Sequence, residues 1–284
     1  MFVLNIPQTP QGRRGFSLVE LSIVLVILGL LVGGVLSGQS LIRAAELRAV
    51  STEYARYSTA MATFRDKYFA LPGDLLNASA FWGALDGNDG SSWDCRGEST
   101  GLATCNGDGD GRLEEMDAIN ANTYERFLVW KHLANAGLIE GIYSGAAATA
   151  TTTVCTTPDA AWDHKGGCNE PLSKMSPTAW STVWIGSSTG SVFLFDGSYG
   201  HSLFLHNKYS RDPVIDYVLR PEEVWNIDVK MDDGRPGTGN IVGVRPYECT
   251  GNPDPALFAT ATYWLNPPGW ASGVRCNPAF RNAF

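Results

Sequence analysis

The chain has 284 residues, of which 44% are hydrophobic and 18% are charged, so it can fold around a sizeable core. Its net charge is −8, and its lysines and arginines are scattered along the chain. A nucleic-acid partner requires a basic face that displaces counterions from phosphates. This charge balance therefore argues against nucleic-acid binding.

The first element is an apolar run over residues 16–36, which is about the ~20 residues that a membrane-spanning helix needs. Arg13 and Arg14 precede it, and such basic flanks stay in the cytoplasm, so we expect the rest of the chain to be exported. A secretory signal peptide would have a shorter apolar core followed by a cleavage site of small residues. A plain membrane anchor fits better but leaves Glu20 unexplained, because a carboxylate is costly inside a membrane.

The stretch "RRGFSLVEL", residues 13–21, resembles the N-terminal signal of type IV pilins and of the related pseudopilins. The resemblance implies that a prepilin peptidase cuts after Gly15 on the cytoplasmic side and methylates Phe16, the new N-terminal residue. It also implies that Glu20 meets the N-terminal amine of a neighbouring subunit, a pairing that favours correct stacking because an unpaired buried charge is costly. One departure is Ser37, which stands where many type IV pilins carry a proline.

The helix is predicted to continue beyond the membrane, because apolar residues recur at steps of three and four on one helical face. These residues are Leu47, Val50, Tyr54, Tyr57, Met61, Phe64 and Tyr68. The sequence "ALPGD" then ends the helix, since Pro72 keeps the preceding residue out of helical geometry and Gly73 permits a turn. We expect one helix over residues 16–69, membrane-spanning in its first half and the spine of a soluble head in its second.

The head, residues 70–284, is predicted to be α+β. A helix is expected from about Glu114 to Ala136, with Gly137 as its terminal glycine. Three short β-rich runs separated by Gly/Ser turns are typical of an antiparallel sheet. They are "STVWIG" at 181–186, "SVFLFD" at 191–196 and "HSLFLH" at 201–206.

A further short helix is predicted within "RPEEVWNIDVKMDDG", residues 220–234, although its apolar spacing also fits a strand. Pro221 suits the first helical position, the two following glutamates suit the positive end, and Lys230 suits the last turn. Gly234 suits the stop. This stretch and "YFALPGD" also resemble, more loosely, segments of larger pilin-like proteins. The fold expected is a long N-terminal helix packed on an antiparallel sheet with extra loops and short helices.

Six cysteines suggest disulfides formed between neighbours in the sequence, although six cysteines allow fifteen pairings. The expected pairs are Cys95–Cys105, Cys155–Cys168 and Cys249–Cys276. No CxxC motif is present, which argues against zinc. The alternative is six reduced thiols in a cytosolic protein. Behind a membrane segment, disulfides on the oxidising side are favoured.

The segment "NGDGDGRLEEMD", residues 106–117, resembles a calcium-binding loop, in which alternate oxygens converge where a glycine lets the chain turn sharply. The ligands would come from Asn106, Asp108, Asp110, the carbonyl of Arg112, Glu114 and Asp117. Two departures are the asparagine at the first position and an aspartate, shorter than glutamate, at the last. No helix is evident before the loop. The alternative is a Gly/Asp turn that binds no ion, but we expect calcium.

No catalytic constellation is predicted, so we do not expect an enzyme. "GSSTG", residues 186–190, has the GxSxG spacing of a hydrolase nucleophile at Ser188, but a strand and not a helix is expected after it. A hairpin turn is the better interpretation. His201 and His206 lie five apart on an expected strand and so face opposite sides. We expect these two, His132 and His164 to be structural or solvated.

The resemblance implies a structural subunit that loses the leader 1–15, remains in the bacterial inner membrane as a single-pass protein and carries a periplasmic head. Its partners would be the prepilin peptidase, the lipid bilayer before assembly, an inner-membrane assembly platform and other pilin subunits in a periplasmic or extracellular filament. The size of the head favours a minor or large pilin. Two alternatives stay open: a pseudopilin of a type II secretion system, and a membrane-tethered head that binds a ligand or acts as an enzyme.

Overall fold

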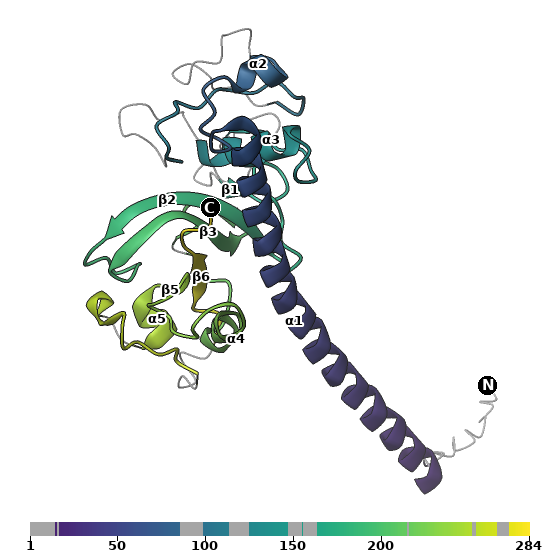
Figure 1. The fold of residues 1–284 in the computed structure, drawn as a ribbon. Helices are drawn as coiled ribbons and strands as arrows, with labels where there is room; N and C mark the ends of the chain where they lie inside the picture. The colour runs from purple at the N-terminus through teal and green to yellow at the C-terminus, as the bar shows by residue number, and fades with distance from the viewer. Residues whose placement is uncertain are drawn as a thin grey trace, which may run out of the picture. The chain divides into compact units, whose positions relative to one another are not determined.

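The α+β architecture is confirmed by a computed structural model, which has a long N-terminal helix, antiparallel sheets and short helices (Figure 1). The structure describes residues 15, 17–85, 99–113, 125–146, 155, 164–214, 216–251, 254–265 and 273–284. The chain divides into two compact units, Met1–Ala45 and Glu46–Phe284. The second unit holds every described element except the first part of the long helix.

The long helix, α1, covers Leu18–Tyr68, close to the predicted limits. Its large apolar side chains up to Ile42 are each at least 50% exposed, as expected of a segment that requires an apolar surrounding. From Val50 onward the predicted apolar stripe is in the core, where Tyr57, Met61 and Phe64 are almost completely buried. The change from exposed to buried apolar side chains along α1, between Ile42 and Val50, therefore falls at the boundary between the two units.

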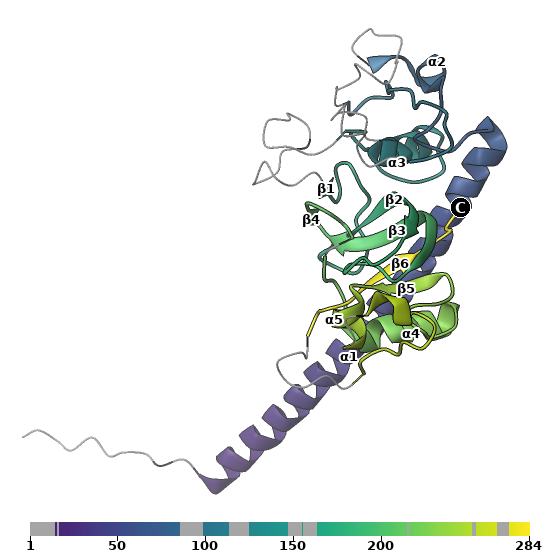
Figure 2. The same cartoon turned by 90° about the vertical axis from the view of Figure 1, so that its left-hand side faces the viewer.

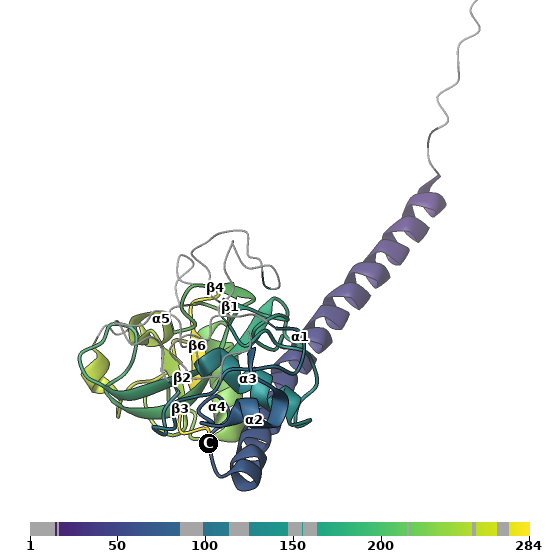
Figure 3. The same ribbon diagram turned by 90° about the horizontal axis from the view of Figure 1, so that it is seen from above.

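Two short helices lie beside the last turns of α1 (Figure 3). They are α2, Ala78–Trp82, and α3, Glu125–Asn135. Trp130 of α3 packs edge-on against Tyr57 of α1, with ring centroids 5.1 Å apart. The predicted stop at Gly137 is confirmed, since this residue has a φ of +72°. The predicted start of α3, at residue 114, lies outside the described residues.

The main sheet is antiparallel and has the strand order β2-β3-β6-β5 (Figure 2). Its strands are β2 (Thr178–Ser188), β3 (Gly197–Asn207), β6 (Asn277–Phe280) and β5 (Ile241–Val244). In register, Trp180 pairs with Leu205 and Leu203 pairs with Phe280. A second sheet joins β1 (His164–Lys165) to β4 (Tyr209–Ser210), also antiparallel.

The prediction of a strand over 191–196 is wrong, and so is the placement of Ser188 in a turn. Ser188 is the last residue of β2 and pairs with Gly197, so residues 189–196 form the loop of a long hairpin. Side-chain acceptors hold this loop, because Asp196 Oδ1 accepts the N–H of Gly190 at 2.7 Å and Ser191 Oγ accepts the N–H of Phe193 at 3.1 Å. Such local bonds compete with strand pairing even where the residues are apolar.

The predicted helix near residue 221 is confirmed as α4, Pro221–Met231, and is followed by α5, Pro246–Thr250, and a 3-10 turn, Pro255–Leu257. Asp228 fixes the end of α4. Its Oδ1 accepts the N–H of Gly234 at 3.0 Å, and its Oδ2 accepts the hydroxyl of Tyr263 at 2.8 Å.

The sheet is attached to α1 through a buried carboxylate, Glu53, which is 5% exposed. Glu53 Oε2 accepts hydrogen bonds from Trp180 Nε1 at 2.8 Å and from Ser173 Oγ at 2.6 Å, and Oε1 accepts the N–H of Lys174 at 2.8 Å. Three donors satisfy most of the acceptor capacity of a charge that burial would otherwise penalise. Trp180 then packs on Phe280 of β6 at 5.4 Å.

Candidate functional site

The first turn of α1 carries the residue expected to act in assembly, Glu20. Its Oε2 accepts the backbone N–H of Ser17 at 2.8 Å, while Ser17 Oγ accepts the N–H of Val19 at 3.3 Å. This pair is a variant of the capping box, with the serine bonded at the second instead of the third helical position, and it satisfies N–H groups that the start of a helix leaves without partners. Its signal, S-x-x-E at 17–20, is present in the sequence and was missed. Gly15 is exposed, and Phe16 lies outside the described residues.

The opening part of α1 is long enough and apolar enough to cross a membrane, by length and composition. The most apolar window of the helix lies near the N-terminus and has no buried residue. A soluble helix of this composition would have to cover these side chains, because large exposed apolar surfaces mark contact with a membrane or a partner. The exposed apolar surface supports membrane anchoring.

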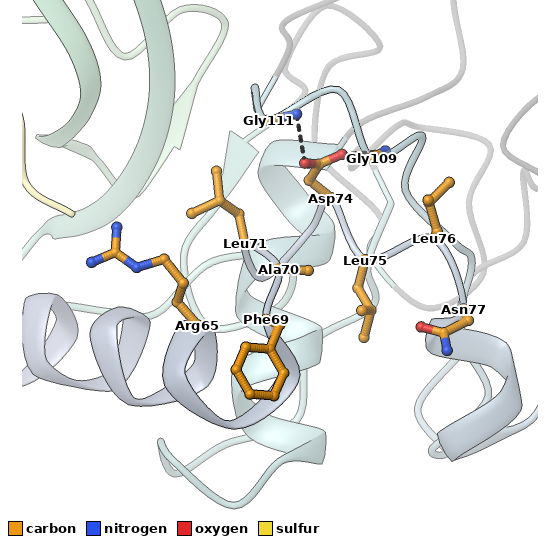
Figure 4. A pocket seen from close by; sticks show the side chains of 10 residues that line it. All are labelled: Arg65, Phe69, Ala70, Leu71, Asp74, Leu75, Leu76, Asn77, Gly109 and Gly111. Carbon is orange, nitrogen blue, oxygen red and sulfur yellow. Dashed lines mark hydrogen bonds between the residues drawn. The ribbon is translucent and has the colours of Figure 1, made fainter.

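Beyond α1, the chain turns sharply at Gly73 and places Asp74 in contact with the loop 107–111. Asp74 is buried, and its two oxygens accept the N–H groups of Gly109 at 2.5 Å and Gly111 at 2.9 Å (Figure 4). Burial raises the pKa of Asp74 to about 6, although the two backbone N–H groups act in the opposite direction. A group that titrates near neutrality thus joins the helix terminus to the Gly/Asp loop.

Two glycines let these backbone segments approach each other. A Cβ at Gly107 would lie 2.4 Å from the Cα of Asp74, and a Cβ at Gly73 would lie 2.6 Å from the carbonyl oxygen of Glu125. Gly73 also has a φ of +96°, which other residues rarely adopt. The glycines of "ALPGD" and "NGDGDG" therefore serve close packing of the corner as well as turning of the chain.

A cavity of about 640 Å³ lies next to this corner, between the last turn of α1 and the loop (Figure 4). Its lining next to Asp74 includes Leu71, Leu75 and Leu76, and Arg65 lines it as well. These apolar walls limit the water that reaches the carboxylate, which is the physical cause of the raised pKa of Asp74.

The residues predicted to bind calcium do not all point toward one position. Asn106 Oδ1 accepts the N–H of Ser79, in α2, at 2.7 Å. Asp108 Oδ1 accepts the N–H of Asp110 at 3.0 Å, and Asp110 Oδ1 accepts that of Arg112 at 2.8 Å, so both form local turns.

The remaining members of the predicted calcium set are only partly described. The guanidinium of Arg112 lies 4.7 Å from the ring centroid of Trp184. Leu113, expected at the apolar position of the loop, is completely buried. Glu114 and Asp117 lie outside the described residues, so the loop as a whole stays a prediction.

A different set of carboxylates meets at this corner: Asp74, Asp108 and Glu125 each place one oxygen within 4.8 Å of the others. Asp108 is exposed and the other two are buried, and the N–H of Asp108 donates to Glu125 Oε1 at 3.0 Å. Carboxylate oxygens are the donors that a hard cation such as Ca²⁺ prefers. Asp74 and Glu125 were missed because they come from other parts of the sequence.

His132 joins the same corner from α3 and is completely buried. Its Nδ1 accepts the N–H of Gly73 at 2.9 Å, so the proton lies on Nε2, which faces the carbonyl of Cys105 at 3.2 Å. Burial lowers the pKa of His132 to about 3, and the imidazole is therefore neutral. A structural role was expected for this residue, and its contacts are those of a connector between three segments.

A second buried group links the two sheets. His164 Nδ1 and His206 Nε2 lie 2.8 and 2.9 Å from separate oxygens of Glu170, and all three side chains are inaccessible to solvent. Burial lowers the pKa of His164 to about 4. Burial alone would raise the pKa of Glu170, but the two imidazoles hold it below its usual range. Two histidines and a carboxylate are also metal donors; here His164 Nδ1 is hydrogen-bonded to Glu170 Oε1, whereas Glu170 Oε2 and His206 Nε2 lie 2.9 Å apart without forming a hydrogen bond.

The sequence did not indicate this triad, because its members come from β1, the following turn and β3. It did predict that His201 and His206 face opposite sides of their strand, and His201 indeed stacks on Phe284 at 5.2 Å, away from the triad.

Two disulfides join the cysteine pairs that were expected from proximity. Cys155 is bonded to Cys168 and Cys249 to Cys276, with Cα separations of 5.8 and 4.9 Å. Cys105 is also disulfide-bonded, and its expected partner, Cys95, lies outside the described residues. Disulfides persist in oxidising compartments, so these bonds agree with an exported head.

Comparison with protein families matches residues 10–36 to the prokaryotic N-terminal methylation motif. Comparison with curated proteins and with solved structures finds no match. The matched segment contains the capping box and the beginning of the exposed apolar helix. The chain therefore carries the type IV prepilin signal, which implies processing by a prepilin peptidase and supports a structural protein of the type IV pilin-like or pseudopilin class.

Proposed function

We propose that this protein is a structural subunit of a type IV pilus-like filament, as a minor or large pilin. The observation that carries the proposal is the methylation motif at 10–36, which leads directly into an exposed apolar helix. The same helix, α1, becomes the spine of a disulfide-bonded α+β head from Val50 onward. The protein is anchored in the inner membrane with its head in the periplasm, and the subunits polymerise through α1.

Processing involves Gly15 and Phe16, and assembly involves Glu20. A prepilin peptidase cuts after Gly15 and methylates Phe16. Glu20 then faces the N-terminal amine of a neighbouring subunit. An ionised carboxylate has about four acceptor positions, and the capping bond to Ser17 occupies one of them. Glu20 can therefore cap its own helix and still bind a neighbour.

The experiment uses Gly15→Val, Glu20→Gln and Ser17→Ala in the native host. Gly15→Val should keep the leader, whereas mass spectrometry of the wild-type protein should find a methylated Phe16. Glu20→Gln should be processed but absent from filaments, because glutamine can still close the capping box while it lacks the charge. Ser17→Ala is the matched control: it removes the cap, about 1 kcal/mol, and should still assemble. An intact Met1 in mature filaments would contradict the proposal.

We also propose that the head binds calcium at the corner formed by Asp74, Asp108 and Glu125, with further ligands from the predicted loop. The support is the loop-like spacing of residues 106–117 together with three carboxylates within 4.8 Å, which repel one another without a cation. Calcium should raise the melting temperature of the full chain in proportion to the logarithm of its concentration above Kd. Asp108→Asn should abolish the rise and Asp66→Asn, an exposed control on α1, should not. Equal melting with chelator and with excess calcium would end this proposal.

A further inference from the structure

A groove of about 320 Å³ lies between α1 and α4 in the second unit. We call it the α1–α4 groove. Its lining includes the polar residues Arg48, Ser51 and Lys230 and the apolar residues Leu47, Ile227 and Met231. No carboxylate is among the described residues that line it, although the chain as a whole has 29 acidic and 21 basic residues. The groove thus gathers two basic side chains, Arg48 and Lys230, on a protein that is acidic as a whole.

The donors of this groove are available to a ligand. In the described part of the chain neither Arg48 nor Lys230 forms an ion pair, and both side chains are exposed. Two other polar side chains at the groove already donate within their own helices: Thr52 Oγ1 to the carbonyl of Arg48 at 3.2 Å, and Asn226 Nδ2 to that of Glu222 at 2.8 Å. Two cations and the Ser51 hydroxyl remain, a set that suits the oxygens of a phosphate.

The place of Arg48 along α1 indicates where such a phosphate would come from. Arg48 follows Ile42, the end of the exposed apolar segment, by six residues, or about 9 Å of helix at ~1.5 Å per residue. The headgroup layer on each side of a bilayer is roughly 5–7 Å thick. Helical side chains also lean toward the helix N-terminus, which here is the end of α1 that enters the membrane. A long arginine side chain can therefore reach the headgroups.

We propose that the α1–α4 groove binds the phosphate of an anionic phospholipid headgroup at the outer face of the inner membrane, before the subunit is assembled. The inference rests on the proposed membrane-anchored pilin. Arg48 and Lys230 bind the phosphate oxygens, Ser51 donates one further hydrogen bond, and the apolar residues of the groove contact the glycerol. Each basic residue near an anionic surface contributes about 1 kcal/mol, so removal of both should weaken lipid binding by about 30-fold.

The test uses the full chain in neutral detergent micelles, with bound lipid counted by native mass spectrometry during titration with phosphatidylglycerol. Phosphatidylcholine, which has the phosphate without net negative charge, and free glycerol 3-phosphate are titrated in parallel. The variant is Arg48→Gln with Lys230→Gln. The matched control, Arg65→Gln with Lys67→Gln, removes the same charge from the last turns of α1. Methylation of Phe16 and filament formation are measured for the same variants in the host.

The expected result is retention of phosphatidylglycerol over phosphatidylcholine by the wild type and the control, and about 30-fold weaker retention by the groove variant. Equal retention by all three proteins would overturn the proposal. Glycerol 3-phosphate bound as tightly as the lipid would show a site for soluble phosphates instead. Loss of self-association in the groove variant, with lipid binding unchanged, would show a subunit interface. Because processing is measured separately, normal methylation with no lipid preference would refute the groove alone and leave the proposed function intact.

Discussion

Acid should destabilise the head through His132, the neutral imidazole that connects Gly73 to Cys105. The pKa of this group is lowered from about 6.5 to about 3 by burial, so the unfolded chain takes up a proton in mild acid and the folded chain does not. Stability that depends on the neutral imidazole is therefore present above pH 6.5 and is lost as the pH falls toward 3. Between pH 7 and pH 5 the loss is about 2 kcal/mol at 1.36 kcal/mol per unit.

The assay is urea denaturation of the full chain in neutral detergent with chelator, followed by tryptophan fluorescence at pH 7 and pH 5. All nine tryptophans lie after residue 80, so the signal reports only the head. His132→Gln can still accept the N–H of Gly73 but does not titrate, and His164, also a buried neutral histidine, is the same in both proteins. The wild type should lose about 2 kcal/mol more than the variant between the two pH values. Equal losses would refute a neutral, buried His132.

Three further substitutions test the packing of the head, each by urea denaturation. Glu53→Ala should cost about 3–5 kcal/mol, because it leaves the indole N–H of Trp180 and two other donors buried without an acceptor; a loss below 1 kcal/mol would contradict the burial of this carboxylate. Phe69→Gly should stabilise by about 1 kcal/mol, since Phe69 has a φ of +56° and a side chain that is 92% exposed, whereas Phe69→Ala should give no gain. Gly107→Ala should cost about 2 kcal/mol or more and reduce any calcium effect, because the new Cβ meets Asp74; unchanged stability would show that the corner is loose.

Elements with strong local rules could be predicted from the sequence. The apolar stripe of α1 and the turn at Pro72 located the helix to within two residues at each end. The Pro221 start and the Gly234 stop identified α4 although its apolar spacing was ambiguous. Residues 191–196 were mistaken for a strand because their apolar side chains obscure the serine and aspartate acceptors that bend the loop. There the local bonds of two polar side chains prevail over β propensity.

The parts of the candidate site that come from distant segments could not be predicted in the same way. Asp74 and Glu125 meet Asp108 only because glycines let three backbone segments touch, and no spacing rule links residues 74, 108 and 125. The triad of His164, Glu170 and His206 likewise draws on separate segments, namely β1, the turn after it and β3. The capping box of Glu20 is the opposite case: its signal is local and readable, but the carboxylate already had an expected use in assembly.

Two glutamates of α1 bear on the proposal that this helix serves both folding and assembly. Glu53 is buried by its own head, which supplies three donors to its oxygens. Glu20 lies in the exposed apolar segment, where the described residues supply one donor, the N–H of Ser17. In an apolar surrounding, the remaining acceptor positions of that carboxylate would be desolvated without compensation, which costs several kcal/mol. Folding supplies hydrogen-bond donors to Glu53 from within one chain. The acceptor positions left open at Glu20 can take a donor from a second subunit.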